Sequence, residues 1–322
     1  MNKTLGLILL PFALALGSAA HAQQFPSRPI TFVVPYAPGG TNDIIARAVA
    51  AKMTTNLGQS AFVENKPGAS GNIGAAFVAK SAPDGYTVLV APISLLAINK
   101  WVYKNLSFDS DKDFAPITNA GSVPNMLIAH PSVSASSVAQ LIAFAKANPG
   151  KLNFASMGTG TTGHLSGELF KLMSGVNIVH VPYKGSGPAL QDLIGGQVQL
   201  MFDNMPTAIK LAQSGKVKGL ALTSTGRHPL APEVPTLHAS GLPGFDVTAW
   251  FGFVAPAATP RPIVDTLNAE IVKALRDPKV SGNLTALGVT IVANKPEEFR
   301  AYIAAESKKW KEVVEKSGAK LD

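Results

Sequence analysis

Short β-branched runs alternate with stretches of helical periodicity along much of the chain. The run Ile30 to Pro35 is followed by a glycine turn and then by helical spacing over Asp43 to Leu57. The same order recurs in two later stretches: Ala61 to Glu64, Ile73 to Ser81 and Tyr86 to Ala91, then Leu152 to Ser156, His164 to Ser174 and Ile178 to Pro182. Strands that alternate with helices over short loops predict βαβ units, and therefore an α/β fold with mainly parallel sheets flanked by helices.

Two extended, β-rich stretches bounded by proline interrupt this alternation. They are Ile117 to Pro131 and Phe245 to Pro256, and each lies between helix-containing blocks. If both stretches cross between two lobes, the first lobe is discontinuous, with residues 23–124 and 246–322 in lobe 1 and residues 125–245 in lobe 2. Two sequential domains joined by one linker are the alternative, because the pattern alone does not show that the C-terminal helices return to the first sheet.

The first 22 residues have the pattern of a secretory signal peptide. Lys3 precedes an apolar run from Leu5 to Gly17, and Ala20-His21-Ala22 supplies the small residues of a cleavage site. The run is shorter than the roughly 20 residues that span a bilayer, which disfavours the alternative of a membrane anchor. We therefore expect export by the Sec-type route, cleavage after Ala22 and, in a bacterium with two membranes, a soluble periplasmic protein.

Composition narrows the function classes. The chain has 322 residues, 46% of them hydrophobic, and this length gives a prior of about two domains. The formal net charge of +8 favours anionic partners, but no basic run interleaved with aromatic residues indicates a nucleic-acid partner. Cysteine is absent, which excludes disulfides, thiolate nucleophiles and cysteine-based metal sites.

Two glycine turns are the candidate binding elements. They run from Tyr36 to Asp43 and from Ser156 to His164, each between a strand and a helix. Ligands of open α/β sheets bind beyond the carboxyl ends of strands, where helix N-termini present free N–H groups and the positive end of a dipole. Glycine allows close approach of the backbone to an anion, and threonine adds a hydroxyl donor. Two such turns can hold a carboxylate between them; alternatively, each is only a glycine-capped helix start.

Enzymatic readings have weaker support. The stretch Gly158 to Gly163 matches a dinucleotide-binding pattern, but no acidic residue follows the next strand at Pro182 to Lys184. The mature histidines lack metal-ligand spacing. A hydrolase that uses His164, Ser166 and an Asp remains an alternative. Asp43 and Asp203 can be read as a carboxylate pair, although they lie far apart in the sequence.

Several long motifs, in order along the mature chain, resemble the Bug family of extracytoplasmic receptors of tripartite tricarboxylate transporters. The longest runs from Val33-Val34-Pro35-Tyr36 through Pro38-Gly39-Gly40-Thr41-Asn42-Asp43, and a second covers Val63 to Gly74. The remaining motifs are Ala82 to Tyr86, Asp113 to Ile117, His180 to Gly185, Gly195 to Val198, Met201 to Asn204 and Val254 to Pro256.

This resemblance implies a two-lobed periplasmic binding protein of the type II-like Venus-flytrap class, with the ligand between the lobes. It implies a small organic acid as ligand and the permease subunits of a membrane transporter as partners. It also implies a monomer without a cofactor, a metal or a catalytic residue. A ligand sensor for a membrane signalling partner uses the same fold and stays an alternative. The implied ligand-binding residues are Tyr36, Pro38, Gly39, Gly40, Thr41, Asp43, Ser94, Ser156, Gly158, Gly160, Thr161, Thr162, His164, Tyr183 and Asp203.

Overall fold

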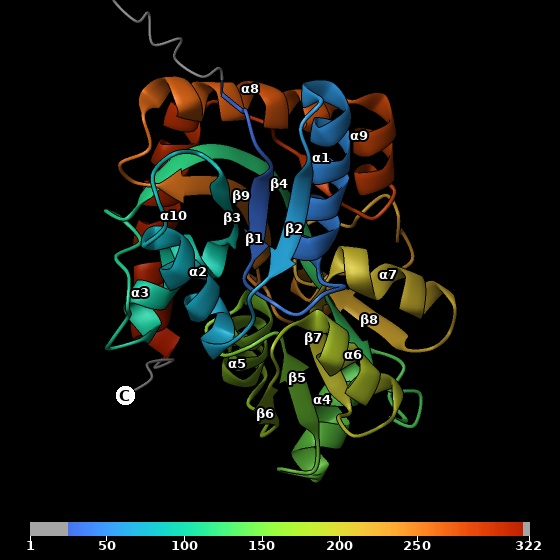
Figure 1. The fold of residues 1–322 in the computed structure, drawn as a ribbon. Coiled ribbons are helices and arrows are strands. Elements are labelled where there is room, and N and C mark those ends of the chain that lie inside the picture. Colours follow the sequence, from blue (N-terminus) through green and yellow to red (C-terminus); the bar gives the residue numbers. More distant parts are fainter. Residues whose placement is uncertain (1–24, 318–322) are drawn as a thin grey trace, which may run out of the picture.

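The chain folds into two α/β lobes, one above the other in Figure 1. The computed structural model describes residues 25–317, and only the backbone of residues 316 and 317. The predicted signal peptide, residues 1–22, and its cleavage site lie outside the described residues. Within residues 25–317, no helix is both long enough and apolar enough to cross a membrane.

The sheet of the first lobe is mixed. Its strand order is β2-β1-β3-β9-β4, and β10 pairs with β4. Strand β1 is parallel to β2 and β3, whereas β9 runs antiparallel to β3 and β4. These strands are β1 (Ile30–Val34), β2 (Ala61–Asn65), β3 (Thr87–Pro92), β4 (Phe114–Ala129), β9 (Thr248–Pro256) and β10 (Thr290–Ile291).

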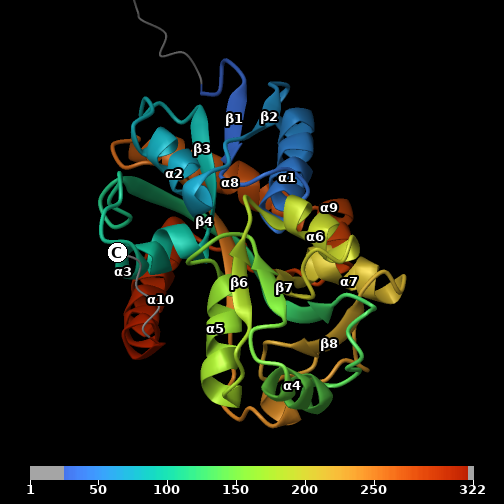
Figure 2. The same ribbon diagram turned by 90° about the horizontal axis from the view of Figure 1, so that it is seen from below.

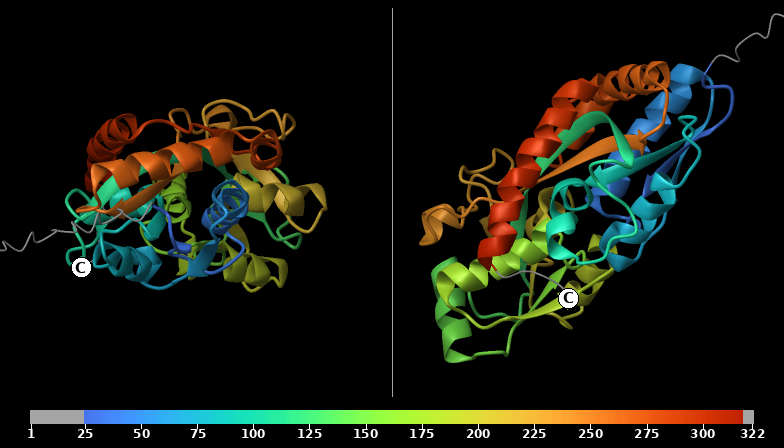
Figure 3. Two further views of the ribbon diagram at one scale, coloured as in Figure 1. Left: turned by 45° about the horizontal axis from the view of Figure 1, so that its top comes forward. Right: turned by 90° about the vertical axis from the view of Figure 1, so that its left-hand side faces the viewer.

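Alternating side chains along β1 bury both faces of this sheet. Phe32 and Val34 point into one hydrophobic core and Val33 into another, as the two-residue repeat of a strand requires. The first core is covered by α1 (Thr41–Leu57), α8 (Arg261–Arg276) and α9 (Pro278–Thr285). The second is covered by α2 (Asn72–Ala79), a π-helical segment (Ser94–Ile98), α3 (Asn99–Val102) and α10 (Pro296–Ser317). Helix α10 runs along the outside of this lobe as far as α5 of the second lobe (Figure 3).

The second lobe repeats the arrangement around a smaller mixed sheet. Strand β5 is parallel to β6 and β7, and the second part of β4 is antiparallel to β7 and β8. Helices α4 and α5 cover one face of this sheet, and α6 and α7 cover the other (Figure 2). The elements are α4 (Val138–Ala147), β5 (Asn153–Ser156), α5 (Thr162–Ser174), β6 (Val179–Pro182), α6 (Ser186–Ile194), β7 (Leu200–Asn204), α7 (Met205–Gln213) and β8 (Lys218–Leu222).

One long strand connects the lobes. Strand β4 pairs with β9 up to Pro124, which lies opposite Thr248, and then pairs with β7 from Asn125 onward. The chain leaves the second lobe just before β9, because the Val247 N–H still donates to the Thr223 carbonyl. We keep the division into residues 23–124 with 246–322 and residues 125–245 as a proposal, which these changes of partner support.

The expectation of mainly parallel sheets is wrong in detail, although the two-lobed α/β fold is confirmed. Four strand pairings are parallel and five are antiparallel among the described residues. The reason is that both lobes use β4, which pairs antiparallel to β7, β8, β9 and β10. The C-terminal helices α8 and α9 pack on α1 of the first lobe.

Candidate functional site

The loop after β1 is held open by a network around Asp43. This carboxylate accepts hydrogen bonds from the Gly39 N–H at 3.1 Å, from Arg47 Nε at 2.8 Å and from Asn65 Nδ2 at 3.1 Å. Burial acts to raise the pKa of Asp43, but these hydrogen bonds outweigh burial and hold the pKa below its usual value. Asp43 is therefore an ionised support of the loop, with its acceptors already in use.

Helix α1 begins at the end of this loop without a side-chain cap. Its N-cap is Gly40 in extended backbone, and no side chain accepts from the first turn. The first N–H groups of a helix have no partner inside the helix, and the dipole makes this end electropositive. The start of α1 can therefore receive a negatively charged group.

The second-lobe loop is also braced from behind. Ser156 Oγ donates to the Gly158 carbonyl at 3.1 Å and lies 2.7 Å from His180 Nε2. The Gly160 N–H donates to His164 Nδ1 at 3.1 Å, and Thr161 caps α5 by accepting from the His164 N–H. Residues 156–164 therefore form a preorganised turn at a second helix N-terminus.

Two neighbouring imidazoles behind this turn are neutral at neutral pH. The rings of His164 and His180 lie 4.2 Å apart, and Phe154 stacks on His180. Burial lowers the pKa of His164 to about 4, and burial together with the neighbouring His164 lowers the pKa of His180 to about 3. Neutral His164 can accept from the Gly160 N–H, whereas a doubly protonated ring cannot.

Each of the two loops contacts the opposite lobe, through residues outside the other loop. The Ala37 N–H donates to the Lys184 carbonyl at 2.9 Å, and Tyr103 Oη donates to the Thr159 carbonyl at 2.9 Å. Glycine is required at 158, where φ is +136° and an added Cβ would lie 2.7 Å from Ser70 Oγ. These contacts describe a closed arrangement of the lobes.

Two neighbouring hollows lie at this closed junction, and we call them the interlobe hollows. In this closed arrangement they leave only about 10 Å³ and about 20 Å³ of free volume, and both are lined by Tyr36, Asn42, Met157 and Asn204. The first is also lined by Val34, Ala37, Gly40, Thr41, Asp43 and Ser186, and the second by Pro92, Ile93, Ser94, Thr161, Thr162, Ala249 and Phe251. Among these described residues no side chain is cationic, so binding of an anion would depend on N–H and hydroxyl donors.

Thr41 provides the most direct indication of a ligand. Its side chain is 2% exposed and lines the first interlobe hollow, yet its hydroxyl has no hydrogen-bond partner in the described structure. A buried polar group without a partner costs free energy, so such groups call for an explanation. A ligand oxygen at the start of α1 would satisfy this hydroxyl.

The predicted site residues fall into three groups. Seven line the interlobe hollows: Tyr36, Gly40, Thr41, Asp43, Ser94, Thr161 and Thr162. Five brace the hollow or its loops from behind: Ser156, Gly158, Gly160, His164 and Asp203. Three lie elsewhere, because Pro38 and Gly39 are exposed and Tyr183 Oη donates to Asp192 at 2.7 Å.

Tyr36, Ser94 and Asp203 show what burial does to these candidates. Tyr36 Oη lies 3.2 Å from Ser94 Oγ, and burial raises the pKa of the phenol, so it stays a neutral donor. Asp203 lies below the hollow, where it accepts from Ser186 Oγ at 2.7 Å and from Thr207 Oγ1 at 2.5 Å. Burial outweighs these hydrogen bonds and raises the pKa of Asp203 to about 6.

Sequence reasoning missed several residues that line the interlobe hollows. Asn42 and Asn204 line both, and Asn204 Nδ2 donates to Asn125 Oδ1 at 2.6 Å. Ser186, Met157 and Phe251 were also not selected. A usable signal existed for Asn204, which stands at the carboxyl end of β7. No such signal exists for Phe251, which lies inside a strand.

The described residues give little support to the enzymatic alternatives. Ser166 Oγ accepts from Asn125 Nδ2 at 3.2 Å, whereas His164 Nδ1 accepts from the Gly160 N–H. A hydrogen bond between Ser166 and His164, which would activate the serine of this alternative, is thus not formed. Within residues 25–317, no group of three His, Cys, Asp or Glu side chains is arranged to hold a metal ion.

Comparisons with known proteins agree with this geometry. A family model described as the tripartite tricarboxylate transporter family receptor matches residues 45–319. Protein BugT of Bordetella pertussis is 38% identical to this chain, and the alignment covers 100% of this chain and 99% of BugT. Rpa4515 of R. palustris, solved with adipate, is 38% identical with a TM-score of 0.89, covering 91% of this chain and 98% of its own. MatC from Rhodopseudomonas palustris, solved with bound malate, is 36% identical with a TM-score of 0.86, and the match covers 90% of this chain and 100% of the MatC chain. The chain therefore belongs to the tripartite tricarboxylate transporter receptor family, whose members include the Bug proteins.

Proposed function

We propose that this chain is a periplasmic receptor that captures a small organic acid between its lobes and delivers it to a tripartite tricarboxylate transporter. The observation that carries the proposal is the unpartnered hydroxyl of Thr41 at the uncapped start of α1, inside a hollow that Met157, Ser186 and Asn204 of the second lobe also line. Helix N-termini are ready-made sites for carboxylates. The proteins solved with adipate and malate support a carboxylate as the ligand class.

Capture needs no chemical step in this mechanism. A carboxylate docks on one loop, and the other lobe closes because the ligand makes its full set of contacts only in the closed state. Burying a carboxylate without a cation is costly unless several hydrogen bonds replace its water. Two helix N-termini and the side chains of Thr41 and Asn204 are the donors that can supply them.

The remaining parts of the proposal concern location and partners. Export and cleavage after Ala22 rest on the signal-peptide pattern of the first 22 residues. The monomeric state and the docking of the closed receptor on permease subunits rest on the resemblance to the family. A pull-down from membranes with the ligand-loaded receptor separates transport from sensing. Recovery of a sensor kinase without permease subunits would contradict delivery to a transporter.

Substitution of Gly40 tests the ligand site directly. An added Cβ at Gly40 would lie 3.8 Å from Ser186 Cβ of the opposite lobe, so the branched side chain of Gly40→Val would hold the loops apart. We expect at least about tenfold weaker binding of the best acid in a calorimetric screen of mono-, di- and tricarboxylates. The melting temperature without ligand should be almost unchanged, because Gly40 has no positive φ.

Gly226→Val is the matched control for this substitution. Gly226 is an exposed loop glycine with nothing within 4 Å of an added Cβ and no positive φ. It should bind like the natural chain. If Gly40→Val and Gly226→Val bind the acid with equal affinity, the interlobe hollows are not the binding site. If no carboxylate gives a heat of binding, the ligand is not a carboxylate.

A further inference from the structure

A second cavity lies on the outside of the first lobe, away from the interlobe hollows. It contains about 250 Å³ and is bounded by the starts of β4 and α10, by the end of β9 and by the π-helical segment. A smaller hollow of about 160 Å³ adjoins it, and the two share Pro116 and Arg300. We call the larger one the outer cavity; its volume is just below the roughly 300 Å³ at which the usual range of small-molecule sites begins, so it suits a small ligand.

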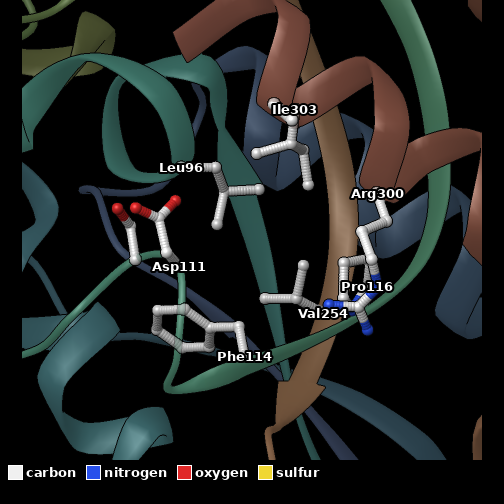
Figure 4. Close-up of a pocket in the computed structure, with 9 residues that line it drawn as sticks. Leu96, Asp111, Phe114, Pro116, Val254, Arg300 and Ile303 are labelled. Atoms are coloured by element: carbon white, nitrogen blue, oxygen red, sulfur yellow. The ribbon is translucent and has the colours of Figure 1, made fainter.

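The floor of the outer cavity is apolar. Leu96, Phe114, Val254 and Ile303 surround the empty space in Figure 4, with Asp111 on one side and Arg300 on the other. All four of these apolar residues belong to the buried core, so the floor is fixed by packing that does not depend on a ligand. An apolar body placed there would be removed from water without rearrangement of the lobe.

At the rim of the outer cavity the acidic side chains are paired with basic ones, whereas one basic side chain is unpaired within the described part of the chain. Asp111 is paired with Lys100, with Nζ 2.6 Å from Oδ1. Glu297, near Arg300, is paired with Arg261. Arg300 has no ion pair or hydrogen bond with any described residue, so the uncompensated charge at this rim is positive.

Two buried hydroxyls at this place also lack partners. Ser110 lines the outer cavity and Thr259 lines the adjoining hollow; each is 7% exposed, and neither Oγ has a hydrogen-bond partner in the described structure. Buried hydroxyls are normally satisfied. Thr259 and Arg300 line the same adjoining hollow, where a hydroxyl donor and an unpaired guanidinium are suited to the oxygen atoms of an acid, whereas Ser110 stands next to Asp111 on the other side of the outer cavity.

We propose that the outer cavity is a second binding site, for an amphipathic monocarboxylate whose apolar body lies on the Phe114, Val254 and Ile303 floor and whose carboxylate faces Arg300. Binding there does not require closure of the lobes. Strand β9 connects the outer cavity to the interlobe hollows, because Val254 of this strand lines the outer cavity and Phe251 lines one of the interlobe hollows.

Methyl NMR with hexanoate as the probe tests this proposal. Leu96, Val254 and Ile303 report on the outer cavity, and Met157 and Ala249 report on the interlobe hollows. We expect saturable shifts at the first group. 1-Hexanol, which has the same apolar body without the charge, should bind about fivefold more weakly. Shifts confined to Met157 and Ala249 would overturn the proposal while leaving the proposed receptor function intact.

Variants of α10 supply the matched controls. Ala304→Trp places a ring in the outer cavity from an exposed position and should abolish the shifts, whereas Ala305→Trp, exposed one residue away, should keep them. Arg300→Gln should weaken hexanoate binding about fivefold, and Lys309→Gln should not. Shifts that survive Ala304→Trp would overturn the site, and unchanged affinity in Arg300→Gln would overturn the assignment of the carboxylate to Arg300.

Discussion

Single side chains at the lobe junction divide into those that build the loops and those left free for a ligand. Asp43 has its oxygens engaged by Gly39, Arg47 and Asn65, whereas the equally buried Thr41 has an unused hydroxyl. The two residues are two positions apart in the same first turn. Position in the sequence therefore does not distinguish the residue that supports the loop from the residue left free for a ligand, whereas their hydrogen-bond partners do.

Thr41→Val tests this division. Valine has the shape of threonine without the hydroxyl, so it removes an unsatisfied buried group. We expect the free energy of unfolding without ligand to stay level or rise by up to about 1 kcal/mol, while affinity for the best carboxylate falls about tenfold. Chemical denaturation and calorimetry measure the two effects. Thr55→Val, on the exposed part of the same helix, is the control, and a loss of stability without a loss of affinity would contradict the assignment.

The histidine pair predicts sensitivity to acid. In the unfolded state the two histidines become protonated near their ordinary pKa of 6.5, whereas in the folded state His164 becomes protonated only near pH 4 and His180 only near pH 3. The unfolded state therefore binds more protons as the pH falls from 6.5 to 4, and the free energy of unfolding decreases by about 1.4 kcal/mol per unit of pKa shift. Asp203 acts in the opposite direction below pH 6, because its folded pKa is raised to about 6.

Denaturant titrations at several pH values measure this balance. We expect net destabilisation of the natural chain below pH 6.5, since two lowered pKa values oppose one raised value. His180→Phe should flatten the profile, because phenylalanine keeps the stack on Phe154 and removes one titrating group. A profile of equal slope in both proteins would show that His180 is not buried in its neutral form.

At the scale of elements, the closed junction depends on contacts between loops that are far apart in the sequence. The hydrogen bond from Tyr103 to the Thr159 carbonyl joins the segment after α3 to the turn before α5. It can form only when the lobes are closed. Such a bond adds to the population of the closed state, and apparent affinity follows that population.

Tyr103→Phe should therefore weaken ligand binding about fivefold, the equivalent of one hydrogen bond, with little effect on the melting temperature. Tyr183→Phe is the informative comparison, because its hydroxyl is bonded to Asp192 within the second lobe. Calorimetry should give the natural affinity for this variant. If Tyr183→Phe weakens binding and Tyr103→Phe does not, the two tyrosines have the reverse of the roles inferred from the structure.

The elements near the binding loops could be predicted because their pattern is local. Strand Ile30–Val34, the glycine turn and helix Thr41–Leu57 follow from a β-branched run, glycines and helical spacing. Side-chain directions could not be predicted in the same way. Tyr183 belongs to a long motif yet bonds to Asp192, and Phe251 enters the hollow from a strand whose place depends on pairing with β3 and β4.

At the scale of the whole molecule, family motifs conveyed what local pattern could not. The two-lobed fold followed from motifs in register along the chain, and the comparisons confirm it. The π-helical segment and the antiparallel pairings of β4 were not predicted, because both arise from tertiary packing around a strand shared by the lobes. The outer cavity had no sequence signal, since its lining comes from four separate segments.

The pairing of Pro124 with Thr248 on adjacent antiparallel strands gives this molecule a modular character. In the proposed division into lobes, the entry and exit of the second lobe are neighbours, so that lobe would be an insertion at the tip of a hairpin. A whole lobe can therefore be exchanged between relatives at these two positions without rethreading the remainder. In such chimaeras, half of the ligand's contacts would travel with the insert, while the outer cavity would stay with the host.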